Sequence, residues 1–154
     1  EDFIRGANES GRDNARTPMQ WSAGPQGGFT TGTPWIEVNP NYATVNTEAQ
    51  ITDDRSVWNH YRTLIELRKQ HEIIVYGDYR SWLDQHLDVF VYARMLGTQQ
   101  LIVIANFRPK EVAVTMPDEL QRRGRCLITN YSEIDVIGET VTLRPYEAFA
   151  LLAI

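Results

Sequence analysis

The sequence contains a single cysteine, Cys126, among its 154 residues. A single thiol excludes a disulfide within the chain and a zinc site built from several thiolates. The chain also lacks a run of about 18 apolar residues of the kind that spans a membrane. Its first residues have neither the basic start nor the apolar stretch of a secretory signal. We therefore expect a cytoplasmic protein, and the missing initiator methionine leads us to expect a piece of a longer chain.

Basic residues are in the minority. The chain has 15 Lys and Arg against 20 Asp and Glu, a formal net charge of −5 at pH 7. Surfaces that bind nucleic acids or anionic membranes need clustered Lys and Arg, so we expect neither partner. Aromatic residues make up 10% of the chain, which is too much for disorder throughout. The length fits one domain, or one domain with an appendage.

The first third of the chain shows neither the period of a strand nor that of a helix. Residues 1–50 hold six of the ten glycines and four of the seven prolines. Turn signals occur at residues 17–18, 24–25, 27–28, 33–34 and 39–41. An irregular segment of about 40 residues is either functional or disordered, and the many aromatic residues in this one argue against disorder.

The spacing of apolar residues changes after residue 52. One helical face, with the i, i+3, i+4, i+7 and i+8 spacing, is formed by Val57, Trp58, Tyr61, Leu64, Ile65 and Leu67 or Arg68. Asp53 or Thr52 can cap the first turn, and the charges of Arg68 and Lys69 suit the last turn. The pattern predicts an amphipathic helix of about 17 residues over 53–70.

After residue 70 apolar side chains recur with a period of 2, which is typical of strands. We predict strands at residues 73–76, 78–83, 89–94, 101–106, 111–115, 125–130, 140–143 and 148–153. The run at 101–107 is apolar almost throughout, as expected for a central strand covered on both faces. The predicted fold is mainly β with one helix: a C-terminal antiparallel β-sandwich, preceded by a helix and a long irregular loop region.

The usual catalytic constellations are missing from the sequence. There is no glycine-rich phosphate loop, and the three histidines lack the spacing of metal ligands, so we expect no metal and no cofactor. His60 is expected at the surface. Cys126 lies in an apolar strand pattern, where a free cysteine acts as a small hydrophobe. A helix start and a loop explain the paired carboxylates at 53–54 and 118–119 better than an acid/base pair does.

Residues 11–21 are the one segment whose composition suggests chemistry. They combine Arg12 and Arg16 with a carboxylate, an amide, a hydroxyl and an indole. An arginine fork can bind a carboxylate bidentately or donate to neighbouring hydroxyls of a sugar, and loops commonly carry binding residues. From composition alone, a binding loop and a loop that satisfies itself through Asp13 are equally good interpretations.

Residues 12–21 read Arg-Asp-Asn-Ala-Arg-Thr-Pro-Met-Gln-Trp. This decapeptide, with the block at 28–36, resembles the oligo-1,6-glucosidases, α-glucosidases of the α-amylase superfamily (glycoside hydrolase family 13). The similarity continues in register through residues 38–42, 61–69, 75–77, 101–107 and 143–148. The decapeptide and the block after it are highly specific to this group, whereas a β-sandwich by itself is not.

The resemblance implies that the chain follows the eighth strand of an N-terminal (β/α)8 barrel. Residues 1–52 would be an active-site loop region, 53–71 the last barrel helix and 72–154 a C-terminal antiparallel β-domain. The nucleophilic aspartate, the acid/base glutamate and the third catalytic aspartate of the family lie upstream and match nothing here. We therefore expect the chain alone to be inactive, because retaining hydrolysis needs two carboxyl groups close together.

One residue with a site role carries over from the family. Arg12 matches the arginine at the floor of the pocket for the non-reducing-end glucose, where it pairs with an aspartate and donates to sugar hydroxyls. Arg16, Asn14 and Gln20 fit a scaffold that holds the loop by hydrogen bonds better than they fit a sugar contact, and Arg16 is the weaker candidate for such a contact. The implied ligand is an α-linked gluco-oligosaccharide, and the implied partner is the missing barrel domain. The calcium loop of the family lies elsewhere, so no metal ligand is expected here.

Other interpretations remain open. The β-part could be a stand-alone carbohydrate-binding module with Tyr79 or Trp82 as a stacking platform, although core packing of Trp82 is favoured, or it could serve structure alone. Without a barrel, the apolar helix face could drive self-association. Trehalose-6-phosphate hydrolases, dextran glucosidases and sucrose isomerases share the decapeptide, so the substrate linkage and the subgroup are not fixed.

Overall fold

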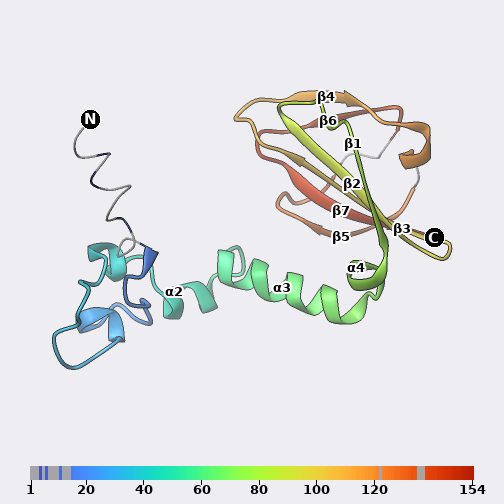
Figure 1. Cartoon of the computed structure of the whole chain (residues 1–154). Coiled ribbons are helices and arrows are strands. Elements are labelled where there is room, and N and C mark those ends of the chain that lie inside the picture. Colours follow the sequence, from blue (N-terminus) through green and yellow to red (C-terminus); the bar gives the residue numbers. More distant parts are fainter. Residues whose placement is uncertain (1–3, 5, 7–10, 12–14, 122, 135–137) are drawn as a thin grey trace. The chain divides into compact units, whose positions relative to one another are not determined.

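The computed structural model describes residues 4, 6, 11, 15–121, 123–134 and 138–154 (Figure 1). The chain forms two compact units, Glu1–Thr63 and Leu64–Ile154. The division falls inside a helix, so the predicted domain boundaries at residues 52 and 71 stay predictions.

The first unit is built from short helical turns joined by loops. Two 3-10 turns, η2 (Pro25–Gly28) and η3 (Pro40–Ala43), precede the short helix α2 (Thr47–Thr52). The longest helix, α3 (Val57–Gln70), begins four residues later than predicted. The reason is local: Asp53 ends α2, and the hydroxyl of Ser56 accepts the backbone N–H of Asn59 at the start of α3.

The apolar face of α3, which the sequence predicts, is exposed in this chain. Val57 is 75% exposed and Tyr61 64%, while Leu64 and Ile65 are each more than 40% exposed. The guanidinium of Arg62 lies 5.8 Å from the centroid of the Trp58 ring, one turn away. No buried side chain belongs to this helix in the described chain, so its stability does not come from packing of that face.

Residues Ile73–Tyr76, predicted as a strand, form one turn of helix, α4. The backbone N–H groups of Tyr76 and Gly77 donate to the carbonyls of Glu72 and Ile73, at 2.8 and 3.1 Å. A short apolar run fits a strand or a buried helical turn equally well by pattern. Here packing decides, because α4 lies against β2 and β3 with Ile73 1% exposed.

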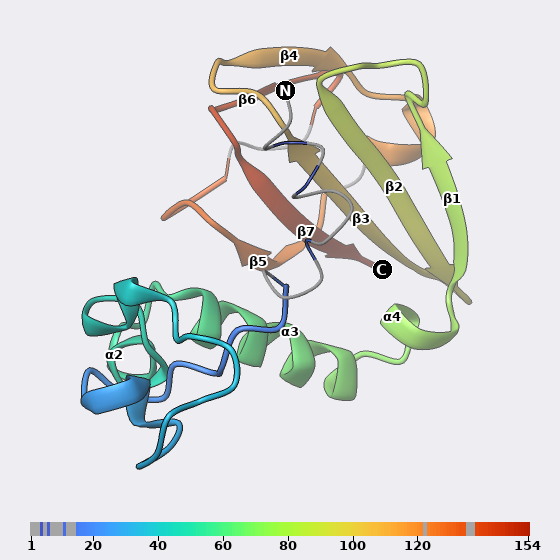
Figure 2. The same ribbon diagram turned by 60° about the vertical axis from the view of Figure 1, so that its left-hand side comes forward.

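The second unit is an antiparallel sandwich, and the other seven predicted strands are confirmed. Its five-stranded sheet has the order β1-β2-β3-β7-β5. The strands of that sheet are β1 (Asp78–Trp82), β2 (Val89–Leu96), β3 (Gln99–Asn106), β7 (Ala148–Ala153) and β5 (Arg125–Thr129). A second sheet pairs β4 (Val112–Thr115) with β6 (Thr140–Leu143), and η4 (Asp118–Leu120) follows β4. Figure 2 shows β1, β2, β3 and β7 running side by side.

The main core lies between these two sheets. The buried residues that β2 and β3 contribute include Val91, Ala93, Ile102 and Ile104, all 0% exposed. Val114, Val141 and Leu143 of the smaller sheet join the same cluster, as does Leu120 of η4. β3 is the middle strand of the larger sheet, which confirms the prediction made from its nearly continuous apolar run.

A buried ion pair closes the turn between β6 and β7. Glu147 is 2% exposed, and its carboxylate accepts the backbone N–H of Arg144 at 2.8 Å and the Nε–H of the same residue at 3.0 Å. The guanidinium of Arg144 also stacks 4.1 Å from the ring centroid of Tyr131 and donates to the carbonyl of Glu133. Burial alone would raise the pKa of Glu147, but the hydrogen bonds and charge of Arg144 lower it below its usual range.

Two further findings concern the described part of the chain. No helix in the described ranges is long and apolar enough to cross a membrane. The same described residues contain no group of three or more His, Cys, Asp or Glu side chains that could hold a metal ion.

The Glu147→Gln substitution should destabilise the second unit. It removes a buried negative charge that three donor groups of Arg144 contact, and hydrogen bonds to charged groups contribute roughly 1.5–3 kcal/mol each. We expect the free energy of unfolding at pH 7, measured by urea titration of the 154-residue chain, to fall by about 2 kcal/mol.

The pH dependence follows from the lowered pKa of Glu147. The stabilisation is present above the pKa of an unfolded glutamate and is lost as pH falls through the lower pKa of the folded state. The difference in stability between the wild type and Glu147→Gln should therefore begin to shrink as pH falls below about 4.3, the ordinary pKa of glutamate, and vanish below the lowered pKa of the folded state. The control is Asp88→Asn, which removes a solvent-accessible pair with Arg108, their side chains being 25% and 47% exposed, and should change stability little. Equal effects of the two substitutions would contradict the prediction.

Candidate functional site

The candidate site is the turn-rich segment that begins with the arginine-containing decapeptide. Arg12 and Asn14 lie outside the described residues. Arg16 is described, and its side chain is exposed. The structure therefore leaves the predicted sugar contacts of Arg12 and Arg16 as predictions, and shows how the residues after them are held.

Gln20 joins the decapeptide to a part of the chain more than twenty residues away. Its side-chain amide donates to the Asn41 side-chain oxygen at 2.8 Å and to the Val45 carbonyl. Its own carbonyl accepts both the backbone N–H and the hydroxyl of Thr47, at 2.9 and 3.1 Å. The predicted scaffold role of Gln20 is confirmed, since four hydrogen bonds fix the decapeptide's end to the start of α2.

The Gly27-Gly28 turn closes a small loop directly after the decapeptide. The carbonyl of Gly27 accepts the backbone N–H groups of Trp21 and Ser22 at 2.7 and 3.0 Å. Gly27 has a φ of +63° and is buried, and a Cβ there would lie 3.2 Å from a methyl group of Val38. Both the positive φ and the close approach require glycine at this position.

Two buried polar side chains hold the end of the segment, and the sequence analysis did not find them. Asn46, 5% exposed, caps α2 by accepting the Ala49 N–H at 2.9 Å, and it donates to the Tyr42 carbonyl at 2.9 Å. Ser56, also 5% exposed, donates to the Gln50 carbonyl at 2.6 Å. An asparagine followed two residues later by Glu48 was the available signal for the start of α2.

Large apolar side chains of the segment point outward. Trp35 is 99% exposed, and Met19, Trp21 and Phe29 are each about half exposed. The segment is thus held by hydrogen bonds to its own backbone, while its aromatic side chains remain available to other groups. A loop of this kind can present side chains to a ligand or to another part of a protein.

The remaining sequence candidates have structural explanations. His60 is exposed, as predicted, and the ring nitrogen Nδ1 of His86 accepts the backbone N–H groups of Asp88 and Val89 in the β1–β2 turn. Cys126 packs against the main core, and burial raises the pKa of its thiol, so it is not an activated nucleophile.

The paired carboxylates are explained in the same way. Asp53 ends α2 and accepts the backbone N–H of Arg55 at 2.9 Å, and Asp118 and Glu119 form the first turn of η4. The carboxylate of Asp118 also accepts the side-chain amide of Gln121 at 3.0 Å, so Asp53 and Asp118 both have local structural roles.

The two residues proposed to stack on a sugar differ in their exposure. Trp82 is 9% exposed and belongs to the main core, so it cannot serve as a platform for a sugar. Tyr79 is 55% exposed, but its ring is tilted by 35° to that of Tyr92, 5.4 Å away. The carbohydrate-binding interpretation is therefore wrong for Trp82 and left open for Tyr79.

Two known protein families match different parts of the chain. The alpha amylase catalytic domain matches residues 1–77, which is half of the chain, and the C-terminal domain of the alpha-amylase SusG matches residues 89–149. The second match covers most of the β-sandwich from β2 onward.

Similar proteins are glucoside-processing enzymes. The chain is 49% identical to an oligo-1,6-glucosidase of Parageobacillus thermoglucosidasius over 141 residues, 90% of this chain and 25% of that protein. It is 43% identical to a trehalose-6-phosphate hydrolase of Bacillus subtilis, over 89% of this chain and 25% of that protein.

A solved structure of the same kind of enzyme is similar to this fold. The fold superimposes on the crystal structure of Bacillus licheniformis trehalose-6-phosphate hydrolase with a TM-score of 0.85 and 37% identity, over 92% of this chain and 26% of that one. The chain thus spans about a quarter of the length of the proteins it matches. The match of the alpha amylase catalytic domain to half of its residues shows that this chain belongs to the alpha-amylase family of glycoside hydrolases.

Proposed function

We propose that the chain is the C-terminal part of an α-glucosidase that hydrolyses non-reducing-end α-1,6 or related α-glucosidic bonds of short oligosaccharides with retention of configuration. The observation that carries this proposal is the 49% identity to an oligo-1,6-glucosidase across nine-tenths of the chain. The likeness to a trehalose-6-phosphate hydrolase makes an α-glucosidic bond the common feature of the candidate substrates.

In this proposal the chain supplies one wall of the glucose pocket and a supporting domain. Arg12 donates to sugar hydroxyls and pairs with a carboxylate of the barrel, because its fork suits both partners. The hydrogen bonds of Gln20 support this role, since they fix the residues that follow Arg12 along the chain. The acid/base and nucleophilic carboxyl groups come from the rest of the catalytic domain.

The β-sandwich has a structural role in the proposal. Its core is formed by its own two sheets, and Trp82, one of the two residues considered for sugar stacking, is used in that core. Packing of this kind stabilises a domain without contacting a substrate. We therefore expect changes in the sandwich to alter stability before they alter the preference for a substrate.

The first test is a chimera in which this chain replaces the matching last quarter of the Parageobacillus thermoglucosidasius oligo-1,6-glucosidase. We expect the purified chimera to hydrolyse isomaltose and p-nitrophenyl α-glucoside, because the two parts together complete the site. The 154-residue chain alone should show no turnover above buffer, since it lacks the paired carboxyl groups. Hydrolysis by the chain alone, or an inactive but folded chimera, would contradict the proposed function.

Arg12→Lys in this chimera tests the pocket residue. Lysine keeps the charge but loses the bidentate fork, and losing a charged hydrogen bond of roughly 1.5–3 kcal/mol corresponds to a 10- to 100-fold fall in kcat/KM. Arg16→Lys is the matched control and should change kcat/KM less than about threefold, because Arg16 is the weaker candidate for a sugar contact. A larger effect at Arg16 than at Arg12 would show that the wrong arginine had been assigned.

Gln20→Ala tests the scaffold. The change removes two side-chain hydrogen bonds, to Asn41 and Val45, each contributing about 1 kcal/mol. Limited proteolysis of the 154-residue chain within residues 20–46 should become roughly thirtyfold faster, as local opening becomes more frequent. Thr31→Ala, at an exposed position of the same segment, should leave the cleavage rate unchanged. Unaltered cleavage in Gln20→Ala would mean that the hydrogen bonds of Gln20 do not hold the segment.

A further inference from the structure

The turn between β1 and β2 is held by a histidine that acts as a hydrogen-bond acceptor. The ring nitrogen Nδ1 of His86 accepts the backbone N–H of Asp88 at 3.1 Å and that of Val89 at 3.2 Å. The backbone N–H of His86 donates to the carbonyl of Leu83 at 2.8 Å, which closes the first part of the same turn. Two backbone donors therefore converge on one nitrogen of the imidazole.

This arrangement fixes the protonation state of the ring. A neutral imidazole has one nitrogen that donates and one that accepts, whereas both nitrogens of the charged form donate. Since Nδ1 of His86 accepts two hydrogen bonds, the ring proton lies on Nε2. A second proton has to go to Nδ1, where it would face two N–H groups. The closed turn therefore requires the neutral ring.

The proton can reach the ring, but the groups that it displaces cannot all reach water. His86 is exposed. Val89 is the first residue of β2, is 5% exposed and packs into the main core. A buried backbone N–H without a partner is costly, so the turn has to move before the N–H of Val89 can bind water.

Movement of this turn would also break its contacts with the β3–β4 turn. The carbonyl of Asp88 accepts the backbone N–H of Phe107 at 2.9 Å. The guanidinium of Arg108 binds the carboxylate of Asp88 and donates to the carbonyl of Leu87 at 3.3 Å. His86 thus holds in place the residues through which the two neighbouring turns are joined.

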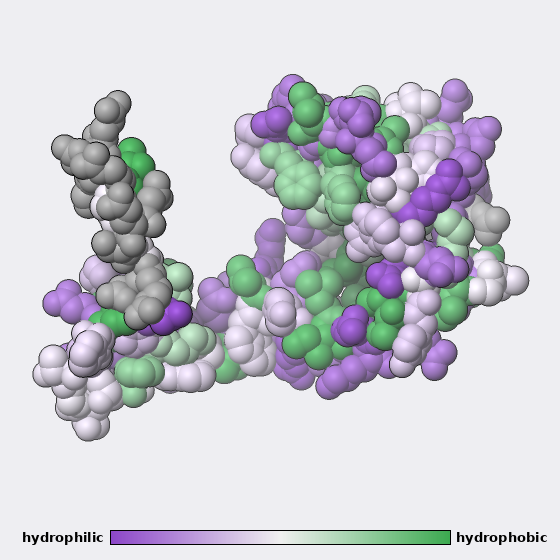
Figure 3. Space-filling model, viewed as in Figure 1, coloured by the Kyte–Doolittle hydropathy of each residue, from purple (hydrophilic) through white to green (hydrophobic). Residues whose placement is uncertain are grey.

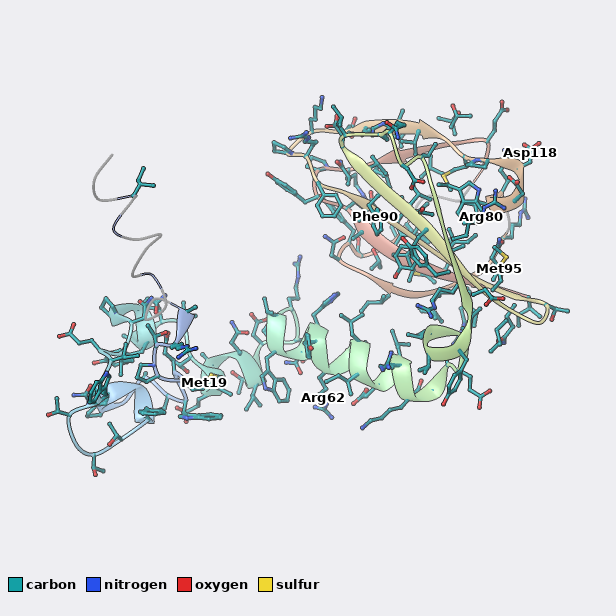
Figure 4. All side chains as sticks on the ribbon, in the orientation of Figure 1. Met19, Arg62, Arg80, Phe90, Met95 and Asp118 are labelled. Carbon is teal, nitrogen blue, oxygen red and sulfur yellow. The ribbon has the colours of Figure 1, made fainter. Side chains whose placement is uncertain are left out.

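The figures place this junction at one end of the sandwich. Figure 4 shows Phe90 of β2 and Arg80 of β1, the strands that the turn joins. Figure 3 shows hydrophilic, purple residues at the upper end of this unit, where β1 and β2 are joined in Figure 1. The turn therefore lies at a polar end of the unit, and water has access to it.

The charges near His86 do not themselves titrate where histidine does. On its own turn lie Asp84, which is exposed, and Asp88. On the β3–β4 turn, Arg108 and Lys110 both contact the carboxylate of Asp88. The hydrogen bond from Arg108 is the main reason why the pKa of Asp88 is lowered, so Asp88 stays charged between pH 5 and 8. Its attraction for a charged imidazole opposes the loss of the two hydrogen bonds and is the same throughout that range.

The β6–β7 turn contacts the same junction. The backbone N–H of Tyr146 donates to the carbonyl of Arg108 at 3.0 Å. The charged residues of that turn, Arg144 and Glu147, bind each other. The β6–β7 turn therefore brings a paired acid and base, and no imidazole, to this end of the sandwich.

We propose that His86 makes the β1–β2 turn a pH-sensitive switch: the neutral imidazole holds the turn closed against the β3–β4 turn, and protonation of Nδ1 opens it. Histidine is the side chain that ordinarily changes its charge between pH 5 and 8. The closed turn has no room for a second ring proton, so proton binding favours the open turn and acid opens it. All the groups of the switch lie in the second unit, and none of them depends on the proposed function.

The opening is local. Val91, Ile102 and Ile104 are 0% exposed between the two sheets, and no group of the switch is needed to bury them. Segments at the end of a domain open with a smaller free energy than its core strands. Protonation should therefore loosen the turn while the sandwich stays folded.

Amide hydrogen exchange of the 154-residue chain, followed by NMR at pH 7.5 and pH 5, tests the switch. Each rate is divided by that of an unstructured peptide at the same pH. We expect the protection of the Val89 and Phe107 amides to fall roughly tenfold or more at pH 5, since two hydrogen bonds of about 1 kcal/mol each are lost. The amide of Ile104 should stay protected at both pH values. An unchanged protection of Val89 would overturn the proposal.

Substitutions at position 86 separate a switch from a merely structural turn residue. In His86→Asn the side-chain oxygen can accept the N–H of the residue two positions on, as in an Asx turn, and does not titrate. We expect its protection to differ between the two pH values by less than about twofold. His86→Ala lacks any acceptor, and Val89 should exchange at both pH values as it does in the wild type at pH 5.

The other two histidines of the chain provide the matched controls. His60→Asn and His71→Asn remove the remaining imidazoles and should keep the full pH response of Val89. A pH response that persists in His86→Ala would show that another group carries it and would overturn the proposal. Loss of the response in His60→Asn or His71→Asn, with His86 intact, would do the same.

Discussion

The apolar character of both faces of the five-stranded sheet is the constraint on which the second unit depends. β3 lies in the middle of that sheet, and its side chains enter two separate clusters, with Ile102 and Ile104 on one side and Leu101 on the other. Burying either face is strongly favourable, at roughly 25 cal/mol per Å² of apolar surface. The β4–β6 pair satisfies one face, and α4 satisfies part of the other.

The first unit is organised by a different interaction. Its turns bury few apolar side chains, and hydrogen bonds to backbone groups take the place of a core: Gln20, Asn46 and Ser56 each contact backbone more than two residues away. Such an arrangement holds a loop in one conformation while leaving its aromatic side chains exposed. The two units thus differ in what holds them together: an apolar core in the second, and hydrogen bonds to the backbone in the first.

Much of the fold and part of the site could be predicted from the sequence. Alternation located seven strands, because a side chain's face in a strand is set by its parity, and the decapeptide indicated the family. The scaffold role of Gln20 followed from the resemblance and was confirmed. The caps formed by Asn46 and Ser56 were missed, because α2 has only six residues and is too short to show a helical period of apolar side chains.

What the sequence determined by itself was the local pattern: where strands alternate, where turns break the chain, and which family the decapeptide belongs to. Tertiary structure decided the rest. The apolar run at Ile73–Tyr76 became a helical turn because a sheet face was there to receive Ile73. Tertiary packing also places Trp82 in the core, whereas Tyr79, on the opposite face of the same strand, stays exposed. Neighbouring positions in a strand look alike in sequence, and only the surface packed against each face distinguishes them.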